Sequence, residues 1–504
     1  MHIAIVGAGY SGLVTASTLI SFGHTVVIFD SAPDVGGVWS ATRYYPGLKA
    51  QNTKDTYCFS TLPMPEEYSL HPDGQQVQAY LETFVRKNGL DKEGRLKLNV
   101  EVVQAEKGDS GWIIQIRSKQ DDQTKSYFFD YLICATGIFN QPHIPYLRGA
   151  NDFVAAGGVI LHSSNFHHLS SIKDKNVVVV GYGKSACDAA VSVATSAKSV
   201  TIVARNIIWK LPTYVGGVLH FSLLLLTRFG EALFPFIRPW KSQRFLNCGM
   251  RVYFRNLLFT VLSWIITIQM RLDEFQIHPH KPFETIARSS ISLASAGFVD
   301  AMSKGDIKVE REVTVESLSP RNVTLSSGKE LSADVIICGT GWKQNIPSFI
   351  SAQLADTLKD KNGDWLLYRH VFPIDIEDLA FIGFNSSIFC PLTAEITSIW
   401  LAAHLRTDEQ DPLLVLTSRH QQRQKTAEEV TWHRERTEGH HASGTSIVPF
   451  SMSNIDEMLG DLEVEIGWLD YMREWVLPIR PSAYRYILPT VLQRVNAGRK
   501  EKIA

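Results

Sequence analysis

The chain has 504 residues, of which 45% are hydrophobic, a length that predicts about three domains, each able to bury its own core. Its 50 Lys and Arg against 51 Asp and Glu leave a formal net charge of −1, which argues against nucleic acid as a partner. The six cysteines are scattered without a CxxC pair, which excludes a disulfide-scaffolded secreted module and a cysteine-rich zinc site and fits a reducing compartment.

A first nucleotide-binding pattern begins at the amino terminus. Residues 2–6 and 25–29 are apolar runs typical of strands buried in a parallel sheet, and Asp30 follows the second run. Between them, a glycine turn leads into the helical stretch 13–22. In such a unit the turn approaches a pyrophosphate at a helix N-terminus, and the acid binds a ribose. The turn residues expected to bind the cofactor are Gly7, Gly9, Ser11 and Gly12.

The same pattern returns at residues 176–180, which are followed by a second glycine turn and the strand 200–203. The residue 23 positions after Gly181 is Ala204, whereas the residue 23 positions after Gly7 is Asp30. Arg205 comes next, and a guanidinium can bind a ribose 2′-phosphate that a carboxylate would repel. The second turn therefore favours NADPH, and its expected binding residues are Gly181, Gly183, Lys184, Ser185, Ala186 and Arg205.

Each copy closes in the same way, with a buried strand that runs into a Thr-Gly turn at residues 130–137 and 334–341. A ligand can approach the backbone closely at such turns, which adds Thr136, Gly137 and Gly341 to the expected cofactor residues. The predicted fold is α/β, with two Rossmann-like dinucleotide-binding domains. Two such domains in one chain imply a bound flavin that is reduced by a diffusing nicotinamide.

Further motifs lie between the repeats: Gly-Gly-Val-Trp at 36–39, Tyr-Pro-Gly-Leu at 45–48, the pair Asn52-Thr53, and a linker at 156–166 that contains His162. With them the chain resembles the class B flavoprotein monooxygenases, which include flavin-containing and Baeyer–Villiger monooxygenases. The resemblance implies an FAD-binding domain split into residues 1–150 and 336–504, around an NADPH-binding domain at 151–335. The flavin-site and linker residues it adds are Gly37, Val38, Trp39, Asn52, Thr53, Val103 and His162.

The resemblance also implies the chemistry. NADPH would reduce FAD, O2 would form a flavin C4a-hydroperoxide, and the NADP⁺ left behind would shield it. Asn52 matches an asparagine that in the family lies near the flavin C4a, which makes it the catalytic candidate. His162 is expected to position the linker rather than to take part in the reaction.

The branch of the family is inferred from two departures. Residues 278–283 carry no Arg after Lys281, and the linker ends at Phe166 without the Trp that is typical of Baeyer–Villiger enzymes. Both favour oxygenation of a nitrogen or sulfur centre in a hydrophobic small molecule, with a specialised metabolite as a candidate. Baeyer–Villiger oxygenation of a ketone, a flavin reductase without oxygenation, and a nucleotide-sensing module without turnover stay open as alternatives.

Residues 216–275 form an apolar insertion, predicted to be helical, within the NADPH-binding part. Its longest apolar run, residues 256–270, is shorter than the roughly 20 residues of a membrane-crossing helix. It predicts either buried helices or peripheral membrane contact. The chain opens on a strand without a signal-like segment, which predicts a cytoplasmic protein that could associate with the cytoplasmic face of a membrane.

The last hundred residues carry weaker signals. The polar segment 406–446 predicts a solvated helix followed by a loop. No metal site is expected, because His433, His440 and His441 lack carboxylate or Cys partners nearby in the sequence. The oligomeric state is left open.

Overall fold

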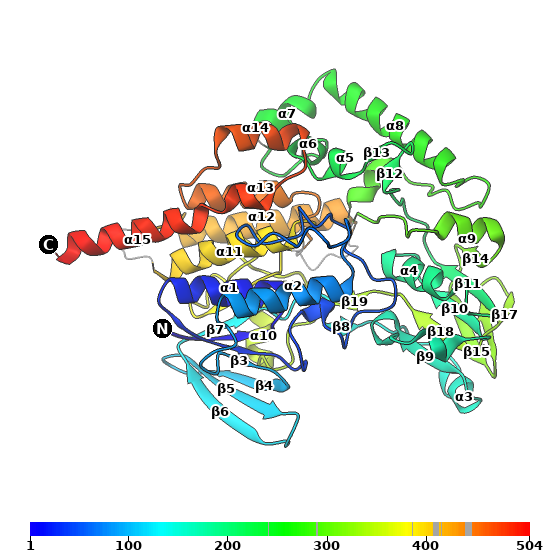
Figure 1. The fold of residues 1–504 in the computed structure, drawn as a ribbon, viewed down its shortest axis with the longest axis horizontal. Helices are drawn as coiled ribbons and strands as arrows, with labels where there is room; N and C mark the ends of the chain where they lie inside the picture. Colours follow the sequence, from blue (N-terminus) through cyan, green and yellow to red (C-terminus); the bar gives the residue numbers. More distant parts are fainter. Residues whose placement is uncertain are drawn as a thin grey trace.

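The computed structural model describes residues 1–239, 241–288, 291–385, 387–406, 413–414, 416–438 and 446–503 (Figure 1). The first domain is built on a five-stranded parallel sheet with the order β20-β7-β1-β2-β3. Its edge strand β20 lies more than 200 residues after the other four strands, so this domain is split in sequence as expected. Its strands are β1 (His2–Val6), β2 (Thr25–Phe29), β3 (Leu96–Lys97), β7 (Tyr131–Cys134) and β20 (Leu379–Phe381).

The second domain repeats this sheet, with five parallel strands in the order β14-β11-β10-β18-β9. Four strands correspond one to one, because β10, β11, β14 and β18 take the places of β1, β2, β3 and β7. The α/β class with two Rossmann-like domains is thereby confirmed. The strands are β9 (Val159–His162), β10 (Asn176–Val180), β11 (Ser199–Ala204), β14 (Ile307–Arg311) and β18 (Val335–Cys338), so β18 runs three residues past the expected boundary at 335.

Each domain also carries a three-stranded antiparallel sheet, and the two chain crossings between the domains pair with each other through β8 (Gln141–Pro142) and β19 (Trp342–Lys343). The first antiparallel sheet consists of β4 (Val100–Lys107), β5 (Trp112–Ser118) and β6 (Thr124–Phe129). The second consists of β15 (Val315–Ser319), β16 (Asn322–Leu325) and β17 (Glu330–Ser332).

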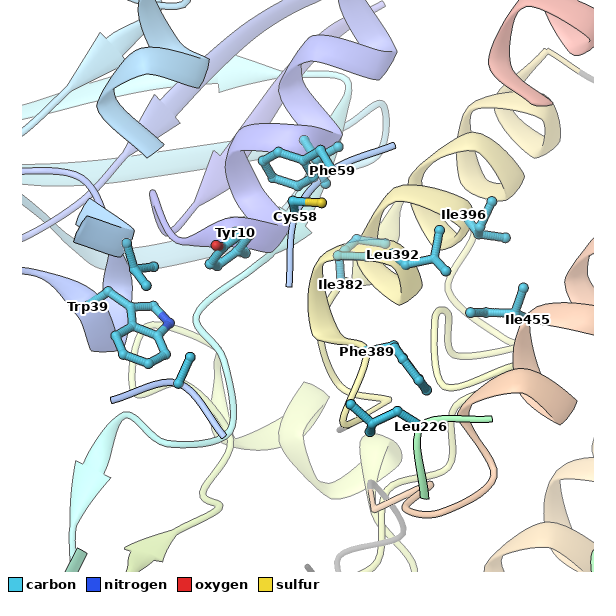
Figure 2. Packing of buried hydrophobic residues seen from close by; sticks show 14 of the residues in the cluster. Tyr10, Trp39, Cys58, Phe59, Leu226, Ile382, Phe389, Leu392, Ile396 and Ile455 are labelled. Atoms are coloured by element: carbon cyan, nitrogen blue, oxygen red, sulfur yellow. The ribbon is translucent and has the colours of Figure 1, made fainter. Parts of the chain in front are cut away.

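Helices cover the sheets, and the largest core forms where α1 (Tyr10–Ser21) packs against α11 (Cys390–Leu405). Figure 2 shows this core, with Leu392 and Ile396 of α11 lying between Phe59 on one side and Ile455 on the other. Leu226, from the apolar insertion, joins the same cluster beside Phe389. The other helices of the two domains are α2 (Gly74–Lys87), α3 (Ala150–Ala155), α4 (Lys184–Val193), α9 (Phe298–Lys304) and α10 (Ala352–Leu358).

The insertion is mainly helical, as expected, and begins within a short hairpin of β12 (Tyr214–Val215) and β13 (Leu219–His220). Its last helix is longer than the apolar run in the sequence. With 19 residues and a mean hydropathy of 1.3, that helix is long and apolar enough to cross a membrane by length and composition alone, and only 11% of it is buried. The helices are α5 (Ser222–Leu225), α6 (Arg228–Ala232), α7 (Lys241–Leu246) and α8 (Arg251–Gln269).

The carboxyl-terminal segment forms α12 (Arg419–Thr437), α13 (Ser451–Asp461), α14 (Trp468–Val476) and α15 (Ile487–Ile503). The expectation of a solvated helix within 406–446 was only partly right, because one face of α12 is buried. On that face, Glu429 forms an ion pair with Arg238 of the insertion. Arg228 similarly joins Asp456 of α13 to Glu474 of α14. Buried charges that pair in this way fix the insertion to the carboxyl-terminal helices.

Candidate functional site

A cleft of about 920 Å³ lies at the carboxyl ends of the first sheet's strands and extends to the second domain and the insertion. Open α/β sheets bind ligands at this edge. The cleft brings together most residues expected at the flavin site and two from the second glycine turn. The expected residues that line it are Gly7, Gly9, Ser11, Asp30, Gly37, Val38, Trp39, Asn52, Thr136, Gly137, Lys184 and Ser185.

The first glycine turn is shaped by contacts that no other residue would tolerate. A Cβ on Gly7, where φ is +116°, would lie 2.4 Å from the Ala135 carbonyl oxygen. A Cβ on Gly12 would lie 1.8 Å from the carbonyl oxygen of Gly7, so this glycine lets α1 start against the turn. A Cβ on Gly9 would instead meet Gly37 at an ordinary 3.6 Å. The space beside Gly9 is therefore left for a ligand that approaches the backbone.

Asp30 stands at the end of β2, on the wall of the cleft. Its two carboxylate oxygens accept hydrogen bonds from the backbone N–H groups of Ala8, at 2.6 Å, and Ala32, at 2.8 Å. Burial raises its pKa, while these bonds and nearby Arg43 oppose the rise. A carboxylate held in this way keeps lone pairs for ribose hydroxyls.

Arg43 is a cleft residue that the sequence reasoning missed. Its guanidinium lies 5.2 Å from the Trp342 ring centroid, donates to the Phe139 carbonyl, and lines the cleft near Asp30. A partly buried cation at this place suits the pyrophosphate of a dinucleotide. A single arginine in a turn has no pattern that could have marked it.

The second glycine turn keeps the first and middle glycines but changes the third. A Cβ on Gly181 would lie 2.4 Å from the Gly339 carbonyl oxygen, whereas one on Gly183 would meet nothing within 4 Å. Ala186 replaces the third glycine, and Gly339 faces it, with only 2.6 Å between the Ala186 Cβ and any Cβ at 339. In the first copy the small and larger residues are exchanged, since Gly12 faces Ala135. Each turn thus leaves room for one methyl group, which the first copy places at Ala135 and the second at Ala186.

We expect Gly339→Ala to lower the free energy of unfolding by about 1–3 kcal/mol, because its new methyl group would overlap Ala186 in a packed turn. Chemical denaturation of the purified protein measures this. Ala135→Gly is the matched control, since it removes a methyl group at the equivalent place and should cost less. Equal stability of Gly339→Ala and the wild type would contradict this packing.

Basic side chains lie around the second glycine turn, in contrast to Asp30 at the first. Arg205 follows β11, is exposed, and forms no hydrogen bond or ion pair with any residue that the structure describes. Lys184 is held by Asp188, with Nζ–O distances of 2.5 and 2.6 Å, and Asp188 also accepts from Ser295 Oγ at 2.5 Å. Lys210 is buried beside the ring of Tyr182. Arg205 is therefore a cation that stays available to a ligand at this sheet edge.

Asn52 is buried on the cleft wall, and its Nδ2 donates to the Ile388 carbonyl at 2.7 Å. The loop that carries it is anchored by Glu395 of α11, which accepts from the Ser60 N–H at 2.8 Å and from Ser60 Oγ at 2.5 Å. Burial raises the pKa of Glu395. Thr53 does not line the cleft, and its hydroxyl pairs with that of Thr56 within the same loop.

His162 ends β9 and holds the second crossing in place. Its Nε2 lies 3.0 Å from the Gly341 carbonyl oxygen, which fits a donating N–H, and its Nδ1 then accepts from the Ser164 N–H at 3.2 Å. The ring also packs on Trp342, with centroids 4.8 Å apart. Burial lowers the pKa of His162, which fits a neutral ring with this bonding. Because neither His162 nor Gly341 lines the cleft, the geometry supports a positioning role.

The remaining candidates lie outside the cleft. Val103 is not among its lining residues; its neighbour Val102 is, beside a β-bulge in β4 that shifts the side-chain alternation. Gly12, Gly181, Gly183, Ala186 and Arg205 also lie outside it. Among the described residues no group of three or more His, Cys, Asp or Glu could hold a metal, and His440 and His441 lie outside the described residues.

The far end of the cleft is apolar. Phe221, Leu225 and Leu226, at either end of α5, line it together with Leu293 and Ile388. Ile388 is the same residue whose carbonyl accepts from Asn52. An apolar ligand bound here would therefore lie next to the Asn52 amide.

Comparison with known proteins agrees with this geometry. A family model described as flavin-binding monooxygenase-like matches residues 1–438. A dimethylaniline monooxygenase (N-oxide-forming) 2 of Macaca mulatta is 27% identical over 424 residues, which cover 79% of this chain and 72% of that protein. A probable flavin-containing monooxygenase 1 of Arabidopsis thaliana is 24% identical over 439 residues, 80% of this chain and 81% of that one.

Two solved structures share the fold across nearly the whole chain. An S-allyl-L-cysteine S-oxygenase from Allium sativum is 19% identical, with a TM-score of 0.63, and the match covers 99% of this chain and 98% of that one. An open crystal structure of cyclohexanone monooxygenase is 16% identical, with a TM-score of 0.68, and the match covers 91% and 97%. The fold of the chain is thus that of these oxygenases.

Proposed function

The chain belongs to the flavin-binding monooxygenase-like family, and from this premise we propose that it oxygenates a nitrogen or sulfur centre of a hydrophobic small molecule. It is an FAD- and NADPH-dependent monooxygenase, with O2 as the second substrate. The pair of glycine turns with opposite charges, Asp30 at the first and Arg205 at the second, supports the two cofactors. The observation that carries the hydrophobic substrate is the apolar end of the cleft beside the Asn52 amide. The N-oxide-forming relative, at 27% identity, supports nitrogen as one target.

The residues of this chain fit both cofactors. Gly9 leaves space for a pyrophosphate, Asp30 presents a carboxylate to a ribose without a phosphate, and Arg43 adds a cation on the same wall. These features suit FAD, whereas the exposed Arg205 suits the 2′-phosphate of NADPH. Bound FAD supplies the redox chemistry with NADPH and O2. The C4a-hydroperoxide implied by the family resemblance stays a prediction.

The protein's own contribution is orientation and exclusion of water. The Asn52 amide can donate or accept a hydrogen bond without changing its charge, and its Nδ2 bond to Ile388 fixes its direction. The apolar wall of Phe221, Leu225 and Leu226 keeps that end of the cleft poor in water. Both effects favour oxygen transfer to a substrate over loss as hydrogen peroxide.

We expect Asn52→Ala to raise the share of NADPH electrons released as hydrogen peroxide by at least about tenfold. This is the size of effect expected when one polar side chain that contacts the reacting groups is removed. The measurement is peroxide release per NADPH consumed, with FAD content checked by absorbance. Asn345→Ala is the matched control, because Asn345 also lines the cleft but is exposed and bonds to Gln141. An unchanged peroxide share in Asn52→Ala would remove Asn52 from the reaction.

A substrate panel tests the oxygenation itself. The purified FAD-loaded enzyme receives a tertiary amine, a dialkyl sulfide or a cyclic ketone of similar size, and NADPH consumption is corrected for peroxide. We expect an N-oxide or sulfoxide and little or no lactone. Lactone as the sole product would favour Baeyer–Villiger oxygenation, and NADPH oxidation that yields peroxide alone with every probe would favour a reductase.

We also propose that the enzyme works in the cytoplasm and contacts the cytoplasmic face of a membrane peripherally, through the insertion at 216–275. Support comes from α8, which is long, apolar and mostly exposed. The measurement is the amount of protein in the membrane fraction after gentle lysis. Absence of the protein from that fraction both at low salt and at high salt would contradict this contact.

A further inference from the structure

The surface helix α14 is amphipathic, but its apolar face points outward and a charged residue points inward. Its buried position is a charged residue, Glu474, which bonds to Arg228 at 2.9 Å. Its outward positions are large and apolar: Trp468 is 71% exposed, Leu469 75%, and Met472 and Val476 lie on the same side. At 100° per residue these four span one face of about 100°. A surface helix that faces only water would place its apolar residues on the inner side.

The helix α8 has the same property over a greater length. Tyr253, Leu257, Val261, Trp264 and Ile268 recur at the spacing of one helix face, and all are exposed, Trp264 to 64%. Phe259 and Ile266, on the opposite face, are buried in the insertion. Exposed apolar patches of this extent mark interaction sites.

The two helices belong to one surface. Figure 1 shows α14 and α8 along the same edge of the molecule, with α6 and α7 between them, and each helix in this row contacts the next. Arg228 of α6 fixes the row, because it bonds to Glu474 and stacks 4.5 Å from the ring centroid of Tyr471. We call the nine outward residues of α8 and α14 named above the α8–α14 surface.

The charges beside the α8 part of this surface are basic, whereas α14 carries Asp470 and Glu474 against Arg473. Residues 241–271, which include α7 and α8, contain five Lys or Arg and no Asp or Glu. Arg251 and Arg255 of α8 form ion pairs with none of the residues that the structure describes. Two copies of the chain that met face to face here would bring these like charges together, whereas anionic headgroups would neutralise them.

The helix α8 is held lengthwise on the protein. Its last residue, Gln269, bonds to the Tyr214 carbonyl at 2.7 Å and to the Gly216 N–H at 2.9 Å. Phe259, in mid-helix, packs on Phe234 with ring centroids 5.5 Å apart. A helix with these contacts cannot stand across a bilayer, but its outer face can lie in the interface plane.

From these observations we infer that the α8–α14 surface docks the enzyme in-plane on an anionic phospholipid membrane, with α14 as a second contact besides the insertion. Resting on the proposed function, the surface also suggests how a hydrophobic substrate reaches the cleft. Leu223 of α5 is exposed, and α5 contacts α6 of the helix row, while Leu225 of the same short helix lines the cleft. A substrate dissolved in the lipid would enter along this side.

Flotation of the FAD-loaded full-length protein tests the docking, with phosphatidylcholine vesicles that either contain or lack phosphatidylserine. We expect binding to the anionic vesicles and its loss at high salt. The double substitution Leu257→Glu and Trp264→Glu should weaken binding by at least about tenfold, and Trp468→Glu with Leu469→Glu by at least about threefold. The matched control, Ile113→Glu with Phe128→Glu, alters an exposed apolar pair of the β5–β6 sheet and should leave binding unchanged.

Every variant should keep its bound FAD and its rate of flavin reduction by NADPH, and these two measurements show whether the variant is folded. Wild-type protein that ignores anionic vesicles would overturn the inference, and so would unchanged binding of the α14 variant. A dimer that falls apart when Leu257 and Trp264 are replaced, without vesicle binding, would show that a second copy covers the surface. Vesicle binding by an enzyme that oxygenates neither amines nor sulfides would refute the proposed function and leave the docking intact.

Discussion

Replacing Gly9 with Ala is expected to leave the chain folded but to weaken FAD binding at least about a hundredfold, or about 2.7 kcal/mol. Gly9 precedes α1 with φ −84° and ψ −171°, a conformation open to any residue, and its added Cβ would meet Gly37 at only 3.6 Å. The methyl group would instead occupy the wall of the cleft, where a pyrophosphate must approach the backbone. Titration of the apoprotein with FAD measures the loss.

The second turn provides a reciprocal control. Gly183→Ala also adds a methyl group with nothing within 4 Å, at φ −69° and ψ 178°. It should weaken NADPH and spare FAD, whereas Gly9→Ala should weaken FAD and spare NADPH. Tight FAD binding by Gly9→Ala, with the fold intact by circular dichroism, would show that the flavin lies elsewhere.

Replacing Arg205 with Ala is expected to raise the KM for NADPH by about thirtyfold to a hundredfold and to leave the KM for NADH nearly unchanged. A charge-assisted, bidentate bond to phosphate is worth about 2–3 kcal/mol, and only NADPH carries that phosphate. The position supports the role: Arg205 stands one residue beyond Ala204, the counterpart of Asp30, at the carboxyl end of the second sheet. Steady-state kinetics with both nucleotides measure the effect.

Arg321→Ala is the matched control for this experiment, since Arg321 is an exposed arginine that pairs with Asp334 at the opposite end of the same sheet. It should change neither KM. Equal losses for NADPH and NADH in Arg205→Ala would place the phosphate site elsewhere. Arg311 would then be the next residue to test, because β14 pairs it with Ala204.

Much of the fold follows from periodicity and glycine spacing. The strand-turn-helix pattern at Gly7 and again at Gly181 was enough to predict two Rossmann-like domains, because only glycine tolerates the contacts at those turns. The strand β20 could be predicted only through the family resemblance. Three apolar residues, Leu379 to Phe381, carry too little pattern to indicate which sheet they join.

The site was harder to predict than the fold. Asp30 and Arg205 could be found because a fixed spacing leads to them, whereas Arg43 acts through contacts with Phe139 and Trp342 that are distant in sequence. Val103 was expected at the cleft, but a bulge in β4 brings Val102 there instead. The exchange of Gly and Ala between Gly12–Ala135 and Ala186–Gly339 depends on packing across the sheet. A linear pattern cannot show it.

The apolar insertion shows most clearly what could not be predicted from the sequence. Its composition favoured a buried helix but also fitted a membrane-contacting one, since a periodic apolar stripe does not show what covers it. The structure distinguishes the faces of α8, with Phe259 and Ile266 turned inward and Leu257 and Trp264 turned outward. The exposed apolar face of α14 could not be predicted from the sequence, because the inner face of this helix is determined by the bond between Glu474 and Arg228, which lie 246 residues apart.

Oxygen transfer from O2 to the substrate is tested most directly with isotopically labelled oxygen. The FAD-loaded enzyme is given NADPH and a tertiary amine or dialkyl sulfide under ¹⁸O2, and the product is analysed by mass spectrometry. The expected product is an N-oxide or sulfoxide that carries one ¹⁸O atom and is formed with NADPH consumption. Product oxygen that comes from water, or NADPH oxidation that yields labelled hydrogen peroxide alone, would contradict this expectation.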